Sequence, residues 1–138
     1  MRLPASYRTL TLSTVTAALL FCGVTAFAPA EARFHAHLVR AEPAVNDTIA
    51  TTPKAVRLWF SEPVELSLSR VRVVRVGGDT LKTGGLRHEG TEASSASLDF
   101  SAPATAPGTY VVTYHVVARD GHPTRGSYNF VLKGAGGH

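Results

Sequence analysis

The segment TYVVTYHVV, residues 109–117, decides the fold class because its side chains alternate between two faces. Tyr110, Val112, Tyr114 and Val116 fall on one face, and the intervening residues fall on the other. β-Branched and aromatic residues with a period of two favour a β-strand. We therefore expect a strand over residues 109–117.

Weaker segments of the same kind occur throughout the chain. The other expected strands cover residues 54–60, 70–76, 80–81, 97–100 and 126–133. Turns are expected at Gly or Pro clusters around residues 42–43, 77–78, 84–85, 107–108 and 121–126. No segment has a helical period of useful length. Short strands with frequent turns over about 100 residues point to a β-sandwich or small barrel.

Length, charge and motifs limit the classes of function that we expect for this protein. The chain has 138 residues, enough for one domain with one core. The formal charge is +4, from 14 basic and 10 acidic residues spread along the chain, so we expect no nucleic-acid partner. No Ser-His-Asp arrangement, paired-carboxylate site or Gly-rich phosphate loop appears, so we expect no enzyme of these kinds.

The N-terminus has the layout of a secretory signal peptide. Arg2 and Arg8 precede the uncharged apolar segment Leu10–Phe21, and small residues follow. We expect residues 1–32 to be a cleaved signal, residues 33–133 the exported domain and residues 134–138 a flexible tail. The alternative is an uncleaved transmembrane anchor within residues 9–30.

The mature chain is expected to lack sulfur ligands, since Met1 and Cys22, the only methionine and cysteine, both lie in the signal. A transition metal would then be held by nitrogen and oxygen. Asp120-Gly121-His122-Pro123 offers a carboxylate and an imidazole two residues apart, which project to the same side of an extended segment. Cu(II) prefers tetragonal nitrogen and oxygen ligation. Without a metal, the same pair is an ordinary turn or surface hydrogen bond.

Four stretches in order resemble the CopC family of copper-binding proteins. They are HAHLV at residues 35–39 with Pro-Ala at 43–44, LWFSEP at 58–63, PGTY at 107–110, and DGHP at 120–123, followed by Gly126 and Phe130. The resemblance covers residues 35–133. It implies a seven-stranded Greek-key β-sandwich or barrel, described as cupredoxin-like or immunoglobulin-like.

The resemblance also implies a site and a role. Its Cu(II) ligands correspond to His35, Asp120 and His122, and His37 and Glu62 are candidates for secondary positions. It implies a periplasmic copper carrier or buffer that acts in copper homeostasis or resistance, with a CopD-like membrane transporter as a candidate partner. We expect a monomer without enzymatic activity.

Three features depart from the family pattern, one of them being Tyr114-His115 where the family often has Trp-Arg. Cleavage after Ala32 or Ala30 fits the small-residue rule better than cleavage before His35, so the α-amine need not belong to His35. Cleavage after Ala32 would place His35 third, where amine, amides and imidazole can form a square-planar copper site. The loop at residues 77–90 offers only His88 and no methionine, so we expect no useful Cu(I) site.

Two other functions compete with the carrier. One is a metal-free immunoglobulin-like interaction domain, in which Asp120 and His122 are turn residues. The other is a small copper enzyme that holds its metal with an N-terminal histidine, although the sequence shows no aromatic platform for a sugar. Of the remaining histidines, His115 is expected on the strand face opposite Tyr114, and His138 in the tail.

Overall fold

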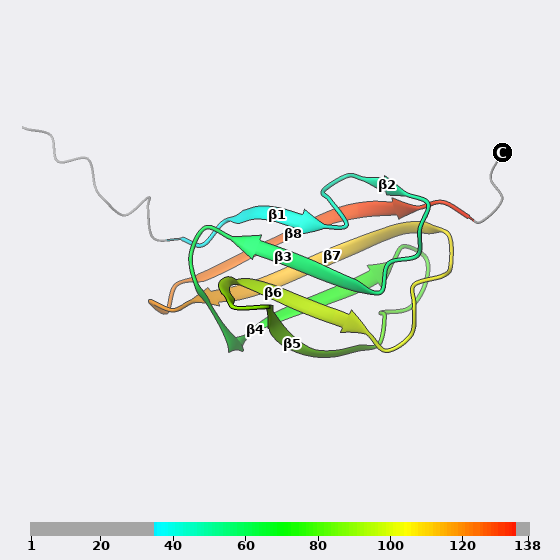
Figure 1. The fold of residues 1–138 in the computed structure, drawn as a ribbon. Coiled ribbons are helices and arrows are strands. Elements are labelled where there is room, and N and C mark those ends of the chain that lie inside the picture. Colours follow the sequence, from blue (N-terminus) through cyan, green and yellow to red (C-terminus); the bar gives the residue numbers. More distant parts are fainter. Residues whose placement is uncertain (1–34, 135–138) are drawn as a thin grey trace, which may run out of the picture.

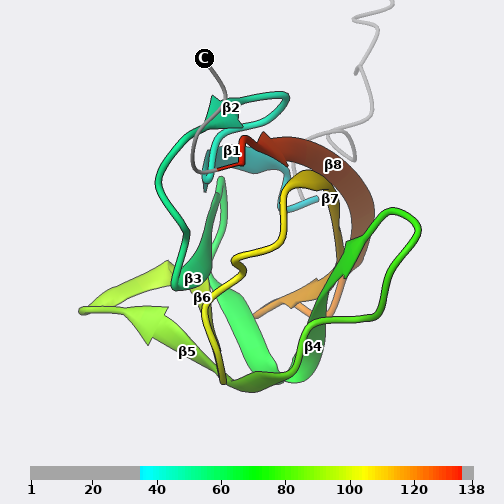
Figure 2. The ribbon, with the colours of Figure 1, turned by 90° about the vertical axis from the view of Figure 1, so that its right-hand side faces the viewer.

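The computed structural model describes residues 35–134 and consists of two packed four-stranded β-sheets (Figures 1 and 2). The first sheet has the order β1-β3-β6-β5 and the second the order β2-β8-β7-β4. The strands are β1 (Leu38–Glu42), β2 (Thr48–Ile49), β3 (Ala55–Phe60), β4 (Val64–Arg75), β5 (Thr83–Glu89), β6 (Glu92–Phe100), β7 (Gly108–Ala118) and β8 (Pro123–Leu132). The expected all-β sandwich is confirmed, and it has eight strands where the resemblance implied seven.

The core lies between the sheets and follows the alternation of β7 and β8. These strands pair antiparallel from Gly108↔Leu132 to Val117↔Pro123, so their inward side chains form a continuous layer. Tyr110 and Phe130 are adjacent in this layer, and their rings stack with centroids 5.2 Å apart. Both are essentially inaccessible to solvent. Burial of large aromatic side chains is a main source of stability for a domain of this size.

Local sequence predicted β7 well and its neighbours less well. The strand β8 begins at Pro123, although residues 121–126 were expected to form a turn. Gly84 and Gly85 were also expected in a turn but lie inside β5, which pairs with β6. Of residues 80–81, which were expected to form a strand, only Thr80 forms an isolated bridge, to Val74. In each case pairing with a neighbouring strand, rather than local propensity, decides the conformation.

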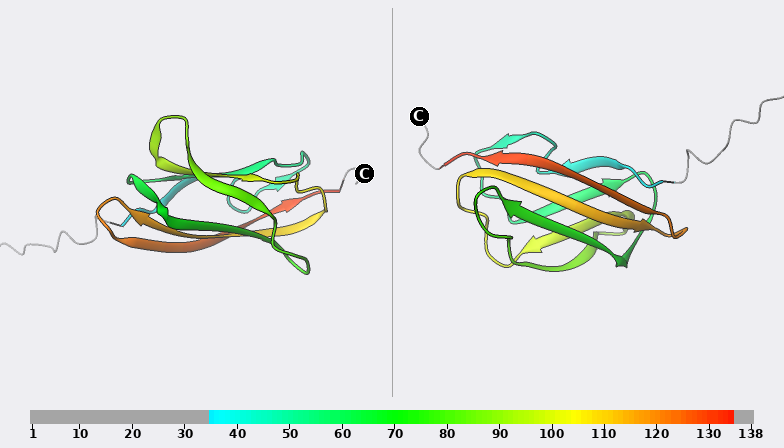
Figure 3. Two further views of the ribbon diagram at one scale, coloured as in Figure 1. Left: turned by 90° about the horizontal axis from the view of Figure 1, so that it is seen from below. Right: turned by 180° about the vertical axis from the view of Figure 1, so that it is seen from behind.

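Three connections that matter for the site lie at one end of the sandwich. The start of β1, the end of β3 and the turn between β7 and β8 are side by side there (Figure 1). The second sheet, seen from behind in Figure 3, carries β7 and β8 along its length to this end. Among residues 35–134 there is no helix long and apolar enough to cross a membrane.

Candidate metal centre

The turn between β7 and β8 holds Asp120 and His122 against each other. His122 Nδ1 lies 3.0 Å from Asp120 Oδ2, and the backbone N–H of His122 donates to Asp120 Oδ1 at 3.0 Å. These contacts, the backbone bond first, lower the pKa of the Asp120 carboxyl below its usual value. Both side chains are about half exposed, at 42% for Asp120 and 54% for His122. The carboxylate is therefore ionised at neutral pH and open to an ion from solvent.

The two side chains meet for a reason that differs from the expected one. The segment is a tight turn rather than an extended strand, with Gly121 at φ +92°, a conformation that favours glycine. The turn is closed by hydrogen bonds from Gly121 N–H to Ala118 C=O at 2.9 Å and from Ala118 N–H to His122 C=O at 3.0 Å. The chain thus reverses direction and projects Asp120 and His122 together from the end of the sheet.

The segment before β1 brings a second imidazole to this turn. Ala36 is fully buried, while His35 and His37 on either side of it are exposed. Ser61, just after β3, holds the segment: its N–H donates to His37 C=O at 2.9 Å, and its hydroxyl accepts from His37 N–H at 3.0 Å. One buried methyl group and two backbone contacts therefore set the direction of His35.

The rings of His35 and His122 meet edge to face, with centroids 5.5 Å apart and planes at 86°. Residues separated by most of the domain sequence are thereby brought together, and His122 also contacts Asp120. Within residues 35–134, no three His, Asp or Glu side chains already form a compact metal-binding group. The arrangement is a juxtaposition of two imidazoles and a carboxylate, in which His122 contacts both His35 and Asp120.

The two secondary candidates occupy different positions. Glu62 lines a small cavity of about 230 Å³ together with Asp120 and Arg119, at the junction of β3 and β4. Arg119 N–H donates to Pro63 C=O at 3.0 Å, which ties this junction to the β7–β8 turn. His37 is exposed, and its described hydrogen bonds are the main-chain contacts to Ser61. Glu62 is therefore beside the site, and His37 contributes through its backbone.

The other histidines stand apart. His115 lies on β7, half-buried, on the face opposite Tyr114. The His88 ring Nδ1 is 2.8 Å from the Ser95 carbonyl oxygen, within the β5–β6 pair. His138 and the expected signal peptide lie outside the described residues.

Ser61 and Ala36 were not singled out from the sequence. Ser61 belongs to the LWFSEP stretch, and Ala36 stands between the two histidines of HAHLV, so both lie in motifs that were noted for other residues. Only the contact between the segment before β1 and the end of β3 reveals that Ala36 and Ser61 position His35.

Comparison with known proteins agrees with the fold. The CopC domain model matches residues 38–133. The chain is 35% identical over 99 residues to protein YobA from Escherichia coli strain K12, covering 72% of this chain and 79% of that protein. It is 27% identical over 121 residues to the copper transport protein CutJ from Bacillus subtilis strain 168, covering 86% of this chain but only 21% of that protein.

A solved structure also supports membership of the CopC family. The crystal structure of CopC from Methylosinus trichosporium OB3b has a TM-score of 0.66 and 32% identity, and the match covers 75% of this chain and 99% of that one. Proteins of this family are periplasmic copper-binding resistance proteins and not enzymes. The sandwich, the motifs at its one end and these matches together establish that the chain belongs to the CopC family.

Proposed function

We propose that the exported chain, residues 33–133 after removal of residues 1–32, is a periplasmic Cu(II) carrier or buffer. Its proposed ligands are His35, Asp120 and His122. The observation that carries the proposal is the approach of the His35 ring to the His122 ring, 5.5 Å between centroids. A metal–nitrogen bond is about 2 Å, and a ring nitrogen lies about 1 Å from its centroid, so two imidazoles on one ion have centroids about 4 to 6 Å apart.

The donor set favours Cu(II). Two imidazoles and one ionised carboxylate supply nitrogen and oxygen, and a terminal amine or deprotonated amide can complete a tetragonal set. In the chain without copper the Asp120 carboxylate contacts Nδ1 of His122, which directs the other ring nitrogen outward, and as a ligand Asp120 would leave this contact for the ion. Glu62, in the cavity beside Asp120, is proposed to stabilise the loop when it carries a cation.

The test is a Cu(II) titration in competition with a chelator, followed by electron paramagnetic resonance. Loss of a direct ligand is expected to weaken binding by about 100-fold or more, beyond the 10- to 100-fold typical of supporting residues. His35→Ala and His122→Ala should both show this loss, and His115→Ala, on the distant face of β7, should bind like the parent protein. Equal affinity of His35→Ala and the parent would exclude His35 as a ligand.

The intact mass of the exported protein identifies its first residue, and this decides whether the terminal amine next to His35 can be a copper ligand. A first residue at His35 supplies an amine next to the imidazole, whereas a first residue at Arg33 places His35 third. Delivery to a CopD-like membrane protein is proposed on the likeness to CutJ, a copper transport protein of which this chain spans a small part. A monomer is proposed as the state that binds, which sedimentation of the apo and copper forms would check.

The competing function is a metal-free interaction domain. It is favoured by the Asp120–His122 contact, since this pair satisfies itself in the turn without an ion. Absence of tight Cu(II) binding from every N-terminus would decide for that function.

A further inference from the structure

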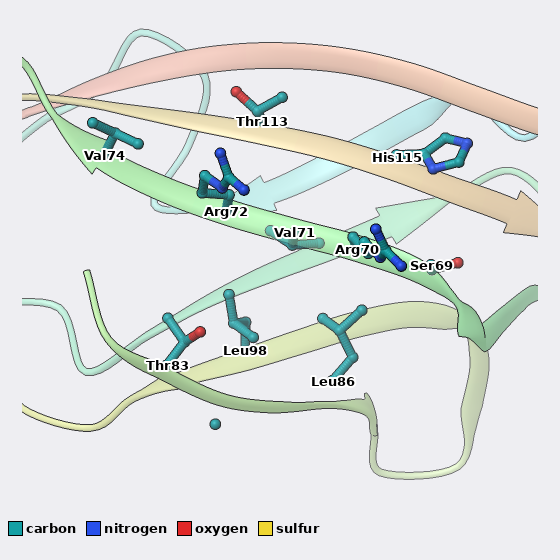
Figure 4. A pocket seen from close by; sticks show the side chains of 11 residues that line it. Ser69, Arg70, Val71, Arg72, Val74, Thr83, Leu86, Leu98, Thr113 and His115 are labelled. Carbon is teal, nitrogen blue, oxygen red and sulfur yellow. The ribbon is translucent and has the colours of Figure 1, made fainter. Parts of the chain in front are cut away.

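β4 and β5 are the last strands of the two sheets on one side of the sandwich (Figure 2). A cavity of about 540 Å³ is lined by residues of these strands and of their neighbours β6 and β7 (Figure 4). Figure 4 shows Leu86 and Leu98 rising from β5 and β6 toward β4. Val71 completes an apolar lining, and Arg70 and Arg72 border the cavity on β4. We call this cavity the β4–β5 groove. No part of it belongs to the metal centre described above.

The main chain of β4 offers hydrogen-bonding groups along the groove. Val73 C=O accepts from Leu81 N–H at 2.9 Å, and Arg75 N–H donates to Asp79 C=O at 3.4 Å, both on the side away from β7. In an antiparallel ladder, every second residue directs its N–H and C=O to the same side. Val71 therefore also directs its groups away from β7, and within residues 35–134 no further strand pairs with it. Such an edge can accept an added strand.

The opposite wall contains Gly84, which is followed by a second glycine, Gly85. Gly84 and Gly85 lie inside β5, at a shift in its register with β6, and neither has a positive φ. A Cβ at Gly84 would meet only the Asp99 carbonyl oxygen, at 3.9 Å, and a Cβ at Gly85 would meet nothing within 4 Å. Neither conformation nor packing of this chain requires glycine at these positions. Glycine inside a strand often marks a bulge, such as the register shift between Thr83 and Leu86, or the close approach of a ligand or of another backbone.

The charges identify the kind of strand that fits. Arg70 and Arg72 are exposed and alternate with Val71, and no carboxylate of the described residues forms an ion pair with either. By contrast, Arg57 and Arg87 on the other sheet are both paired with acidic side chains. A second copy added edge to edge would bring like charges together, which is destabilising. The alternation instead complements a strand with acidic residues on one face and apolar residues on the other.

We propose that the β4–β5 groove binds an extended segment of a partner protein in which apolar residues alternate with Asp or Glu. The segment pairs with the β4 edge through Val71. Its apolar side chains point inward toward Leu86 and Leu98, and its carboxylates lie beside Arg70 and Arg72. Main-chain bonds provide affinity in this mode of recognition, and alternate side chains provide specificity.

The test uses fluorescein-labelled peptides and the copper-free protein as processed by the expressing cell. Fluorescence anisotropy compares a short peptide alternating Val and Glu with one alternating Val and Lys, and with a Val-Glu peptide that carries a central Pro. The Val-Glu peptide should bind at least tenfold more tightly than either control. Amide shifts in nuclear magnetic resonance spectra should be largest at Val71, Gly84 and Gly85. The assay contains no copper, so its failure leaves the Cu(II) proposal untouched.

Variants sharpen the result. Arg72→Glu is expected to weaken binding of the Val-Glu peptide about tenfold. Arg125→Glu, the same charge change on β8, should have little effect on this affinity. Gly84→Val should fill the groove and abolish binding while the thermal midpoint stays near that of the parent. The proposal is overturned if the Val-Glu and Val-Lys peptides bind alike, if neither binds at millimolar concentration, or if the two arginine variants behave identically. Displacement of the peptide by free glutamate alone would assign the groove to small carboxylates and also overturn it.

Discussion

Replacement of Ala36 by Leu should separate the docking of the N-terminal segment from the stability of the sandwich. Ala36 is the one buried side chain of residues 35–37, and two hydrogen bonds to Ser61 hold the backbone beside it. A buried methyl group contributes about 0.8 kcal/mol and each hydrogen bond about 1 kcal/mol, partly offset by the ordering of the backbone. Net docking is therefore worth about 2 kcal/mol or less.

Overpacking a filled site costs about 1–3 kcal/mol, which is comparable to that docking energy. The segment should consequently detach in Ala36→Leu, and the rest of the fold should remain. Copper would then have to supply the lost docking energy, so Cu(II) affinity should fall by up to about 30-fold, following the tenfold change per 1.4 kcal/mol. Chelator competition measures the affinity, and thermal unfolding measures the fold.

The matched control is Ala44→Leu, an exposed position in the turn after β1. Ala44→Leu should change neither the Cu(II) affinity nor the thermal midpoint. The reasoning is refuted if Ala36→Leu binds Cu(II) like the parent while His35→Ala does not, because docking would then be irrelevant to the site. A large loss of thermal stability in Ala36→Leu would also refute it, since Ala36 would then be part of the cooperative core.

Three further predictions concern the sandwich. Phe130→Ala should lower the free energy of unfolding by about 3–5 kcal/mol, measured in urea, because the ring is fully buried in the core; a loss below 1 kcal/mol would contradict this. Gly126→Ala should lower the thermal midpoint because its Cβ would clash with the Tyr114 hydroxyl oxygen, and an unchanged midpoint would show that Tyr114 moves freely. Hydrogen bonding to Arg87 holds the pKa of Asp99 below its usual value, so its stabilisation is present at neutral pH and is lost as the pH falls through that lowered pKa. Asp99→Asn should therefore be less stable than the parent at pH 7 and equal to it in strong acid, and a stability difference that persists in acid would exclude this ion pair as the cause.

The local pattern of residues 109–117 was sufficient to predict β7, and frequent turns were sufficient to predict a β-sandwich. Alternation of side chains is a property of the strand itself, so it is visible without a partner. β5 was missed because its sequence, TGGLRHE, has little strand propensity, and pairing with β6 supplies what the sequence lacks. The start of β8 at Pro123 was missed because pairing with Val117 extends the strand into an expected turn.

The candidate site, like the fold, could be predicted only in part from the sequence. The sequence by itself determined the chemical types, since the motifs around His35 and around Asp120-Gly121-His122 name two imidazoles and a carboxylate and resemble the CopC family. Only the tertiary structure decided that the His35 and His122 rings meet and that Ala36 and Ser61 hold the first of them in place. Contacts between segments far apart in a chain depend on the packing of whole sheets, and no local pattern encodes them. The β4–β5 groove has the same origin, because its two walls belong to different sheets and become neighbours only when the sandwich closes.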